Sequence, residues 1–504
     1  MSAEPPLGTA HVGERGLSQR AAQGAALTFG GQVIRFMIQL TGIIVLSRIL
    51  GPEIIGLFAI AMVVVGLGEV VRDFGLSSAA IQTTELTKVQ RTNLFWINTA
   101  LGVALFAGSV ALAGLVADFY NSDQLQAVLI IAATVLVING VSTQYRAGLS
   151  RDLKFKEIAI LDVVAMMLAT TVAIICALAG AGIWALVIQQ LLIAVVALVL
   201  CVAFARWLPG MPRRSSNMRS LLIFGWNVGL SQLVNYSSRN VDTIVIGRQF
   251  GLEPLGFYNR AYQMLTLPLN QISVPATKVA FPILAKLQGD DTKFNGFLMR
   301  GQLLIVAAVS ALFVPCAAMA EPLVVVLLGE EWKQSAVIFQ VLAAAGLVQS
   351  AAFATYWVFL AKGLTKASLQ YTVLTKSILV ALVILGANWG VIGVAAGYTV
   401  ATAIAWPIGL LWLKRISTAP IGAMAKQAMH TIMVFVAAGM CSYVVAKTLS
   451  PDAPIVSIVS GCGVYLLALG LLFAALRSVR SQFTLIADAV RRASFKSKTI
   501  EIGE

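Results

Sequence analysis

The segment RILGPEIIGLF, at residues 48–58, returns as RQFGLEPLGFY at residues 248–258. Four of the eleven paired positions are identical: Arg48 and Arg248, Gly51 and Gly251, Glu53 and Glu253, and Gly56 and Gly256. Each copy lies between two long apolar segments, which is typical of the hairpin between the first two spans of a helical bundle. A repeat with an offset of 200 residues predicts a duplicated membrane domain, and two related bundles with a site between them are typical of a transporter.

The composition excludes an ordinary soluble domain. Of the 504 residues, 59% are hydrophobic and only 12% are charged, whereas charged residues make up about a quarter of a typical soluble domain. A helix needs about 20 apolar residues to cross a bilayer. Windows of this length predict fourteen spans, at residues 22–47, 55–77, 93–117, 125–146, 158–180, 183–206, 221–247, 258–284, 299–319, 335–360, 368–388, 391–413, 426–447 and 455–476. Residues 321–328 are too short to cross, so we assign them to the end of the ninth span.

The repeat and the spans predict an all-α polytopic membrane protein, with two homologous six-helix bundles followed by two further helices. The stretch WLPGMPRRSSNMRS, residues 207–220, has the proline, glycine, serine and arginine content of a linker between bundles. We expect a cytoplasmic segment at 1–20, an N-terminal bundle at 21–208, a cytoplasmic linker at 209–220, a C-terminal bundle at 221–415, two additional helices at 416–477 and a basic cytoplasmic tail at 478–504.

The basic residues set the expected orientation. If both termini are cytoplasmic, 27 of the 36 Lys and Arg residues fall in inner segments and five fall in outer loops. Such an imbalance favours both termini in the cytoplasm and an even number of spans. The net charge of +14 is therefore explained by topology and by contact with anionic membrane lipids, and it does not indicate a nucleic-acid partner.

Cysteine and histidine residues indicate neither a metal site nor a catalytic centre. The five cysteines lie in apolar spans without metal-ligand spacing, and His11 and His430 are isolated. We expect no catalytic residue, no metal and no cofactor. A membrane enzyme such as a glycan polymerase or ligase is disfavoured, because it needs a sizeable outer loop carrying catalytic residues and the outer loops predicted here are short.

Several predicted spans carry polar residues at membrane depth. Span one holds Arg35 and Gln39, and span seven holds Asn235, Arg239 and Asp242. The offset of 200 places the two sets at corresponding positions of the two bundles, and the spacing within span seven puts its polar residues on one side of the helix. Burying polar groups at membrane depth costs free energy, so we expect these residues to have a function in both bundles.

A charged cluster ends the second span. Glu69, Arg72 and Asp73 are spaced i, i+3 and i+4, so they share one helical face. Two interpretations stay open for this cluster. It neutralises itself and locks the end of the helix, or it takes part in gating or ion coupling.

Four stretches resemble the polysaccharide transporter family, or Wzx-type oligosaccharide flippases, of the multidrug/oligosaccharidyl-lipid/polysaccharide (MOP) flippase superfamily. They are SRILGPEIIGLF from residue 47, FGLSSAAIQ from residue 74, RNVDTIVIGRQFG from residue 239 and GFYNRAYQMLTLPL from residue 256. Within the family, the chain resembles the Wzx-type branch that includes the colanic-acid and teichuronic-acid exporters. The resemblance implies a fourteen-helix flippase of the bacterial inner membrane. It implies that a polyprenyl-pyrophosphate-linked oligosaccharide moves from the cytoplasmic to the outer leaflet by alternating access.

The implied substrate gives the polar residues expected roles. Arginine stays ionised and can hold phosphate oxygens through two parallel hydrogen bonds, so a cationic central cavity would lower the cost of moving a pyrophosphate through the membrane. For substrate binding we expect Arg35, Arg239, Lys376, Asn235, Gln39 and Asn240, with the amides on sugar hydroxyls. For gating or ion coupling we expect Glu69, Arg72, Asp73 and Asp242. Beyond the lipid-linked oligosaccharide and membrane lipids, glycan polymerase or export machinery is an open option as a partner.

Structural interpretations compete with these roles. Arg239 could pair with Asp242, and Arg35 could hydrogen-bond a carbonyl at a helix bend. Arg48 and Arg248 are better explained as groups that organise the outer hairpins, where the adjacent glycines allow a tight turn. The rival functions are an ion-coupled multidrug or metabolite antiporter of the same superfamily and, less well matched, a major facilitator, whose loop signature is missing after span two.

Overall fold

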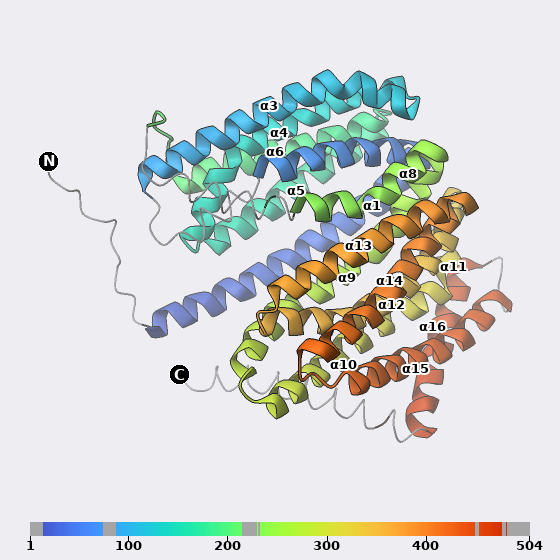
Figure 1. Cartoon of the computed structure of the whole chain (residues 1–504). Helices are drawn as coiled ribbons and strands as arrows, with labels where there is room; N and C mark the ends of the chain where they lie inside the picture. The colour runs from blue at the N-terminus through green and yellow to red at the C-terminus, as the bar shows by residue number, and fades with distance from the viewer. Residues whose placement is uncertain are drawn as a thin grey trace. The chain divides into compact units, whose positions relative to one another are not determined.

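The computed structural model of the chain is all-α, and it describes residues 14–73, 87–213, 229, 232–448, 453–475 and 480, with side chains from Gly30 onward (Figure 1). The chain divides into two compact units, one with residues 1–50 and 60–237 and one with residues 51–59 and 238–504. Several predicted features lie outside the described residues: the segment before residue 14, the motif at 74–82, the linker beyond residue 213, most of 221–231 and nearly all of the tail.

The first copy of the repeat interrupts a long helix. Helix α1 runs from Glu14 to Asp73, but Gly51 has φ 71° and ψ 170°, so two helices meet there. The second copy is built the same way, since Gly251 has φ 91° and α9, Leu252–Leu287, begins directly after it. A positive φ strains any residue with a Cβ atom, so the prediction that glycine makes these turns is confirmed.

The second pair of repeat glycines lets the two copies touch. A Cβ atom added to Gly56 would collide with the carbonyl oxygen of Leu252, and one added to Gly256 would collide with the carbonyl oxygen of Pro52. Residues 51–59 and 252–256 all belong to the second unit, so this is a reciprocal contact inside one compact body. The repeat is therefore the place where the backbones of the two copies cross without side chains between them.

In the first unit, the described residues between α1 and residue 213 form four further helices. They are α3 (Lys88–Tyr120), α4 (Asp123–Arg151), α5 (Phe155–Leu178) and α6 (Ile183–Ala205). Helices α3 and α4 form a tight antiparallel pair, and Figure 1 shows α3, α4 and α6 running side by side. The close approach depends on Gly102 and Gly140, because a Cβ at either position would press on a main-chain carbonyl oxygen of the facing helix.

The second unit holds the remaining elements. After α8 (Val241–Gln249) and α9 come α10 (Asp291–Ala318), α11 (Ala320–Leu327), η1 (Glu330–Trp332), α12 (Lys333–Ala361), α13 (Thr365–Gly386), η2 (Ala387–Trp389), α14 (Gly390–Ile416), α15 (Ile421–Thr448) and α16 (Pro454–Ala475). One expectation was wrong. The short apolar piece at 321–328 does not extend the ninth span but forms most of the separate helix α11, because Met319 leaves helical geometry at φ −111° and ψ 29°.

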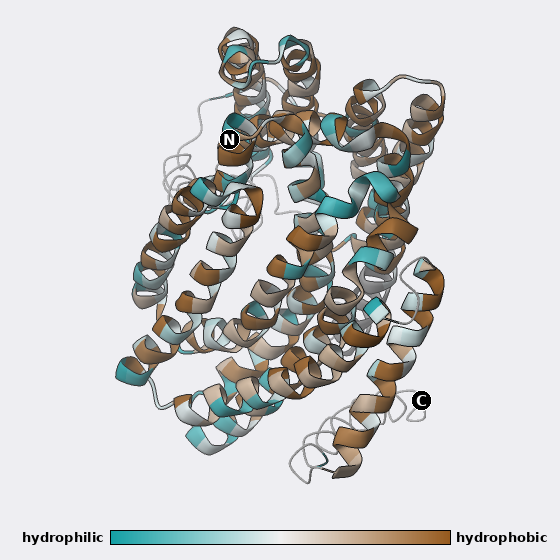
Figure 2. Cartoon of the chain, turned by 90° about the vertical axis from the view of Figure 1, so that its right-hand side faces the viewer, coloured by the Kyte–Doolittle hydropathy of each residue, from teal (hydrophilic) through white to brown (hydrophobic). Residues whose placement is uncertain are grey.

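The described helices are apolar enough for a multi-pass membrane protein. Ten stretches have the length and hydropathy to cross a bilayer. Two of them, Gly30–Asp73 with 44 residues and Thr365–Ile416 with 52, are long enough for two crossings each. Figure 2 shows the hydrophobic bodies of these helices, with hydrophilic residues gathered at several helix ends.

Candidate functional site

A polar cavity of about 540 Å³ lies inside the first unit. Residues of α1, α4, α5 and α6 line it, and its walls are otherwise formed by small or apolar side chains such as Val135, Ala165 and Ile193. Its charged lining residues are Arg35, Arg72, Asp73, Arg146 and Asp162, and its uncharged polar ones are Asn139, Ser142, Thr143, Ser150 and Gln190. Charged groups at membrane depth are expensive and usually mark a transport path, so this cavity is the candidate site.

One carboxylate in the cavity serves two arginines. Both oxygens of Asp162 accept hydrogen bonds at 2.8 Å from the same nitrogen, Nη2, of Arg146. The Nη1 atom of Arg35 lies 3.5 Å from Oδ2 of the same residue, which is a weak contact. The side chains of Arg35 and Arg146 are 48% and 43% exposed, against 22% for Asp162. Each guanidinium has five N–H donors, so both arginines keep donors for a ligand.

The third arginine is locked. Arg72 is only 8% exposed in its side chain, and it donates at 2.7 Å to Glu69 and also to the hydroxyl of Thr143. Asn139 donates to the other oxygen of Glu69 at 2.9 Å. These contacts join the end of α1 to α4. Within the predicted cluster, Glu69 and Arg72 therefore neutralise each other. The gating role expected of these residues stays a prediction, and Asp73 lies on the cavity wall.

The charges of the cavity balance. Arg35, Arg146 and Arg72 are matched by Asp162, Asp73 and the Glu69 that holds Arg72. An anion that enters must therefore compete with a carboxylate already in place, and Asp162 is the one it would compete with for two arginines. The cationic central cavity expected from the sequence stays a prediction.

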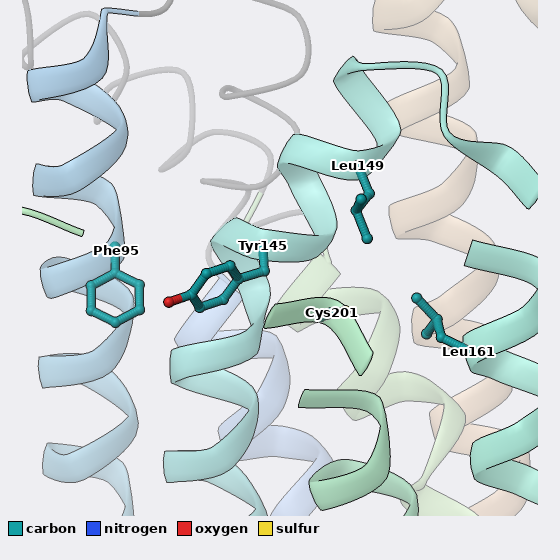
Figure 3. Close-up of a cluster of buried hydrophobic side chains, with 5 residues drawn as sticks. All are labelled: Phe95, Tyr145, Leu149, Leu161 and Cys201. Carbon is teal, nitrogen blue, oxygen red and sulfur yellow. The ribbon is translucent and has the colours of Figure 1, made fainter. Parts of the chain in front are cut away.

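Packing on both sides of Arg146 fixes its place on α4. Its neighbour Tyr145 is 4% exposed, and Leu149, one turn on, is fully buried. Figure 3 shows Tyr145 pointing toward Phe95 of α3 within this apolar cluster, which also contains Leu161 and Cys201. Cys201 belongs both to the cluster and to the cavity wall, so the apolar cluster adjoins the polar site.

The second unit has a different polar centre. Asp242 on α8 is 4% exposed, and it accepts a hydrogen bond of 2.6 Å from the hydroxyl of Tyr258 and one of 2.8 Å from the amide of Thr243. Tyr258 stacks on Tyr262 with the ring centres 6.0 Å apart, and Tyr262 meets Tyr398 edge-on at 5.7 Å. A buried carboxylate is thus held by neutral donors, with an aromatic row behind it.

Two predicted cations lie near this carboxylate. Arg239 ends the helix at 232–239 and is exposed, while Lys376 on α13 is half-buried and interacts electrostatically with both Asp242 and Arg239. Among the described ion pairs, Asp242 does not pair directly with Arg239, because its oxygens face Tyr258 and Thr243 instead.

The predicted substrate residues thus fall into two groups, each inside one unit. Arg35 lines the cavity of the first unit, with Gln39 one turn further along α1. Asn235 also belongs to the first unit and is exposed, whereas Asn240 precedes α8 in the second unit. Arg239, Lys376 and Asp242 form the second group.

Sequence reasoning missed Arg146, Asp162 and Tyr258 as site residues. A signal for Asp162 was present, since it is the single charged residue of the span at 158–180. Arg146 is the last residue of the predicted span at 125–146, whereas α4 continues to Arg151 and so places Arg146 within a helix. Tyr258 gives no signal in the sequence, because its role depends on its partner Asp242.

Comparison with known proteins places these features in a family. Residues 45–337 match the model of the family described as polysaccharide biosynthesis protein. The chain belongs to this family. It is a transporter family, not an enzyme family. It consists of the Wzx-type flippases of the MOP superfamily, which the four sequence motifs resemble.

Curated relatives agree with this family. The chain is 26% identical over 399 residues to the lipopolysaccharide biosynthesis protein WzxC of Escherichia coli (strain K12), covering 76% of this chain and 78% of the relative. It is 30% identical over 298 residues to the teichuronic acid biosynthesis protein TuaB of Bacillus subtilis (strain 168), covering 58% and 62%. This member of the polysaccharide biosynthesis family is therefore a multi-pass membrane protein with bacterial relatives.

Solved structures share the fold. The lipid II flippase MurJ in an inward closed conformation matches with a TM-score of 0.67 at 14% identity, over 90% of this chain and 99% of that one. An inward-facing multidrug resistance MATE family transporter of the MOP superfamily matches with a TM-score of 0.57 at 18% identity, over 78% and 96%. At these identities the likeness is one of fold, and it gives this family member a MurJ- and MATE-like architecture.

Proposed function

We propose that this protein moves a polyprenyl-pyrophosphate-linked oligosaccharide, a repeat unit of a cell-surface glycan, from the cytoplasmic to the outer leaflet of a bacterial inner membrane. The observation that carries the proposal is the pair Arg35 and Arg146, which share Asp162 on the wall of a cavity inside a membrane bundle. Membership of a family of polysaccharide biosynthesis proteins supports it. The proposal includes alternating access and cytoplasmic termini.

The architecture proposed for this function is the one expected from the sequence. It has fourteen spans, with bundles at 21–208 and 221–415, two additional helices at 416–477 and cytoplasmic segments at 1–20, 209–220 and 478–504. The duplication and the MurJ-like fold support this division.

The headgroup is held by exchange of partners. A pyrophosphate oxygen takes the place of Asp162 on Arg35 and Arg146, because phosphate accepts the same paired hydrogen bonds as a carboxylate. Arg239 and Lys376 provide further positive charge in the second unit, and Asn235, Gln39 and Asn240 hydrogen-bond sugar hydroxyls. Glu69, Arg72, Asp73 and Asp242 serve gating or ion coupling.

Alanine substitution of the two shared arginines tests the proposal. In cells whose only copy of the transporter is Arg35→Ala or Arg146→Ala, the glycan should be lost from the surface and its lipid-linked precursor should accumulate inside. Lys156→Ala, an exposed residue of α5 outside the cavity, is the matched control. Membrane abundance of each variant is measured in parallel. Normal glycan export by both arginine variants at normal abundance would defeat the proposal.

The alternative is an ion-coupled multidrug or metabolite antiporter. The two aspartates on the cavity wall favour it, because a cationic compound could bind Asp73 and Asp162. Efflux of a cationic dye by the purified protein in vesicles, abolished in Asp162→Asn, would support the antiporter. Transport of a lipid-linked oligosaccharide without dye efflux would exclude it.

A further inference from the structure

Helix α9 carries a line of uncharged polar side chains. Asn259, Gln263, Thr266 and Asn270 are spaced by four, three and four residues, so they lie above one another on one side of the helix. The first three are partly exposed and Asn270 is exposed. From Asn259 to Asn270 the line is roughly 16 Å long at 1.5 Å per residue. We call these four residues the α9 ladder.

The α9 ladder cannot face acyl chains without cost. An amide or hydroxyl without a hydrogen-bond partner is unfavourable in hydrocarbon, so polar residues of membrane helices face protein or a water-filled space. Among the described helices of 18 residues or more, α9 alone falls outside the ten apolar stretches. We therefore expect the accessible side of the ladder to face an aqueous path.

The fold does not require the ladder. The offset of 200 residues pairs its members with Ala59, Val63, Gly66 and Val70 of α1, none of which has a polar side chain. The hairpin glycines, by contrast, are the same in both copies. A feature that only supported the helix would be expected in both halves, so the ladder serves something that the second half alone does.

Local contacts hold part of the ladder in position. Gln263 donates to the side-chain oxygen of Asn259 at 2.9 Å, and Arg260 donates to the side-chain oxygen of Gln263 at 2.6 Å. Arg260 itself is 5% exposed, so its charge is not presented to a ligand. Asn259 keeps its N–H groups, and within the described chain the amide of Asn270 has no hydrogen-bond partner. The exposed groups are neutral. The amides of Asn259 and Asn270 keep donors, whereas Thr266 donates its hydroxyl to the carbonyl of Tyr262 at 2.9 Å and can only accept from a ligand.

This chemistry fits sugar hydroxyls and not a phosphate. Successive hydroxyls along a glycan both donate and accept hydrogen bonds, which matches a row of amides and a threonine hydroxyl. A pyrophosphate only accepts hydrogen bonds and binds best to cations. We propose that the α9 ladder binds the oligosaccharide part of the substrate and sets which glycan is carried, an inference that rests on the proposed flippase function. The headgroup and the sugars are thus recognised by different residues.

The test compares two probes in vesicles containing the purified full-length protein. One is the lipid-linked oligosaccharide extracted from cells that lack this transporter, and the other is undecaprenyl pyrophosphate carrying a single hexose. Asn270→Ala and Gln263→Ala should slow translocation of the first probe at least tenfold and leave the second within twofold. Val274→Ala, an exposed residue one turn further on α9, is the matched control. Asn270→Gln, which keeps an amide, should restore part of the rate.

The outcomes distinguish failure of the ladder from failure of the flippase proposal. Equal losses for both probes, or no loss for either at normal thermal stability, would overturn the α9 ladder while leaving the flippase proposal standing. Arg35→Ala should slow both probes alike, which separates the headgroup site from the ladder. If the wild-type protein moves neither probe, the flippase proposal fails and the ladder falls with it.

Discussion

The stretch of α1 that follows Gly51 and helix α9 that follows Gly251 each begin with one copy of the sequence repeat, yet only their first turns are alike. Both copies keep the glycine turn and the glycine that allows close backbone contact. Beyond that contact, the first copy is apolar up to the pair of Glu69 and Arg72, while the second carries neutral amides along its length. The comparison separates the glycines that both copies share from the side chains that differ between them.

The two units also differ in the chemistry of their polar centres. The first pairs arginines with carboxylates around a cavity, and the second buries one carboxylate among tyrosines. Paired charges suit the exchange of one anion for another, whereas neutral donors around Asp242 hold a single charge in place. The two units therefore support two kinds of polar chemistry, and the following variants test how far the units differ.

The largest effect is expected at the contact that both copies share. Gly256→Val places a branched side chain against the carbonyl of Pro52, and no flexible side chain is there to move aside. Overpacking of this kind costs about 3 kcal/mol or more in a rigid contact, so most of the folded protein should be lost. Yield after size-exclusion chromatography and the thermal midpoint in detergent measure this. Gly108→Ala, with no atom within 4 Å of the added carbon, is the control.

A second variant removes the neutral donor of the second unit. Tyr258→Phe deletes the hydroxyl that donates to Asp242 at 2.6 Å and leaves the buried carboxylate with the Thr243 amide. Loss of a buried hydrogen bond to a charged group should lower the free energy of unfolding by about 2 kcal/mol. The thermal midpoint reports it, and Tyr443→Phe on the exposed side of α15 should leave it unchanged. A midpoint like the wild type would mean that Asp242 does not depend on Tyr258.

A third variant changes the carboxylate of the first unit and should strengthen substrate binding. Asp162→Asn removes the carboxylate that both Arg35 and Arg146 contact, so an incoming phosphate no longer competes with it. We expect undecaprenyl pyrophosphate to bind about tenfold more tightly, which is about 1.4 kcal/mol, and to be released more slowly. Calorimetric titration in detergent measures the affinity. Weaker binding would show that Asp162 positions the arginines instead of competing for them.

The sequence alone predicted the membrane class and the glycine turns, because hydropathy and positive φ are local properties. It also singled out Arg35, Arg72 and Asp73, which line the cavity of the first unit, while their roles stay predictions. It did not predict that Arg35 and Arg146 share Asp162, since these residues come from three helices and meet only when the bundle packs. The same holds for Tyr258, whose phenol matters only because α9 brings it to Asp242 on α8.

The smallest effect tests whether the turn glycines are equivalent. Gly251→Ala meets no atom within 4 Å, so its only cost is the backbone strain of φ 91°, about 1 to 2 kcal/mol. Gly51→Ala, at φ 71°, should cost the same, because the nearest atom lies 3.9 Å away on Glu331. The two thermal midpoints should therefore fall together and by less than for Gly256→Val. A much larger drop in the thermal midpoint at one position would show that the two turns contribute differently to stability, although they are alike in sequence and in φ.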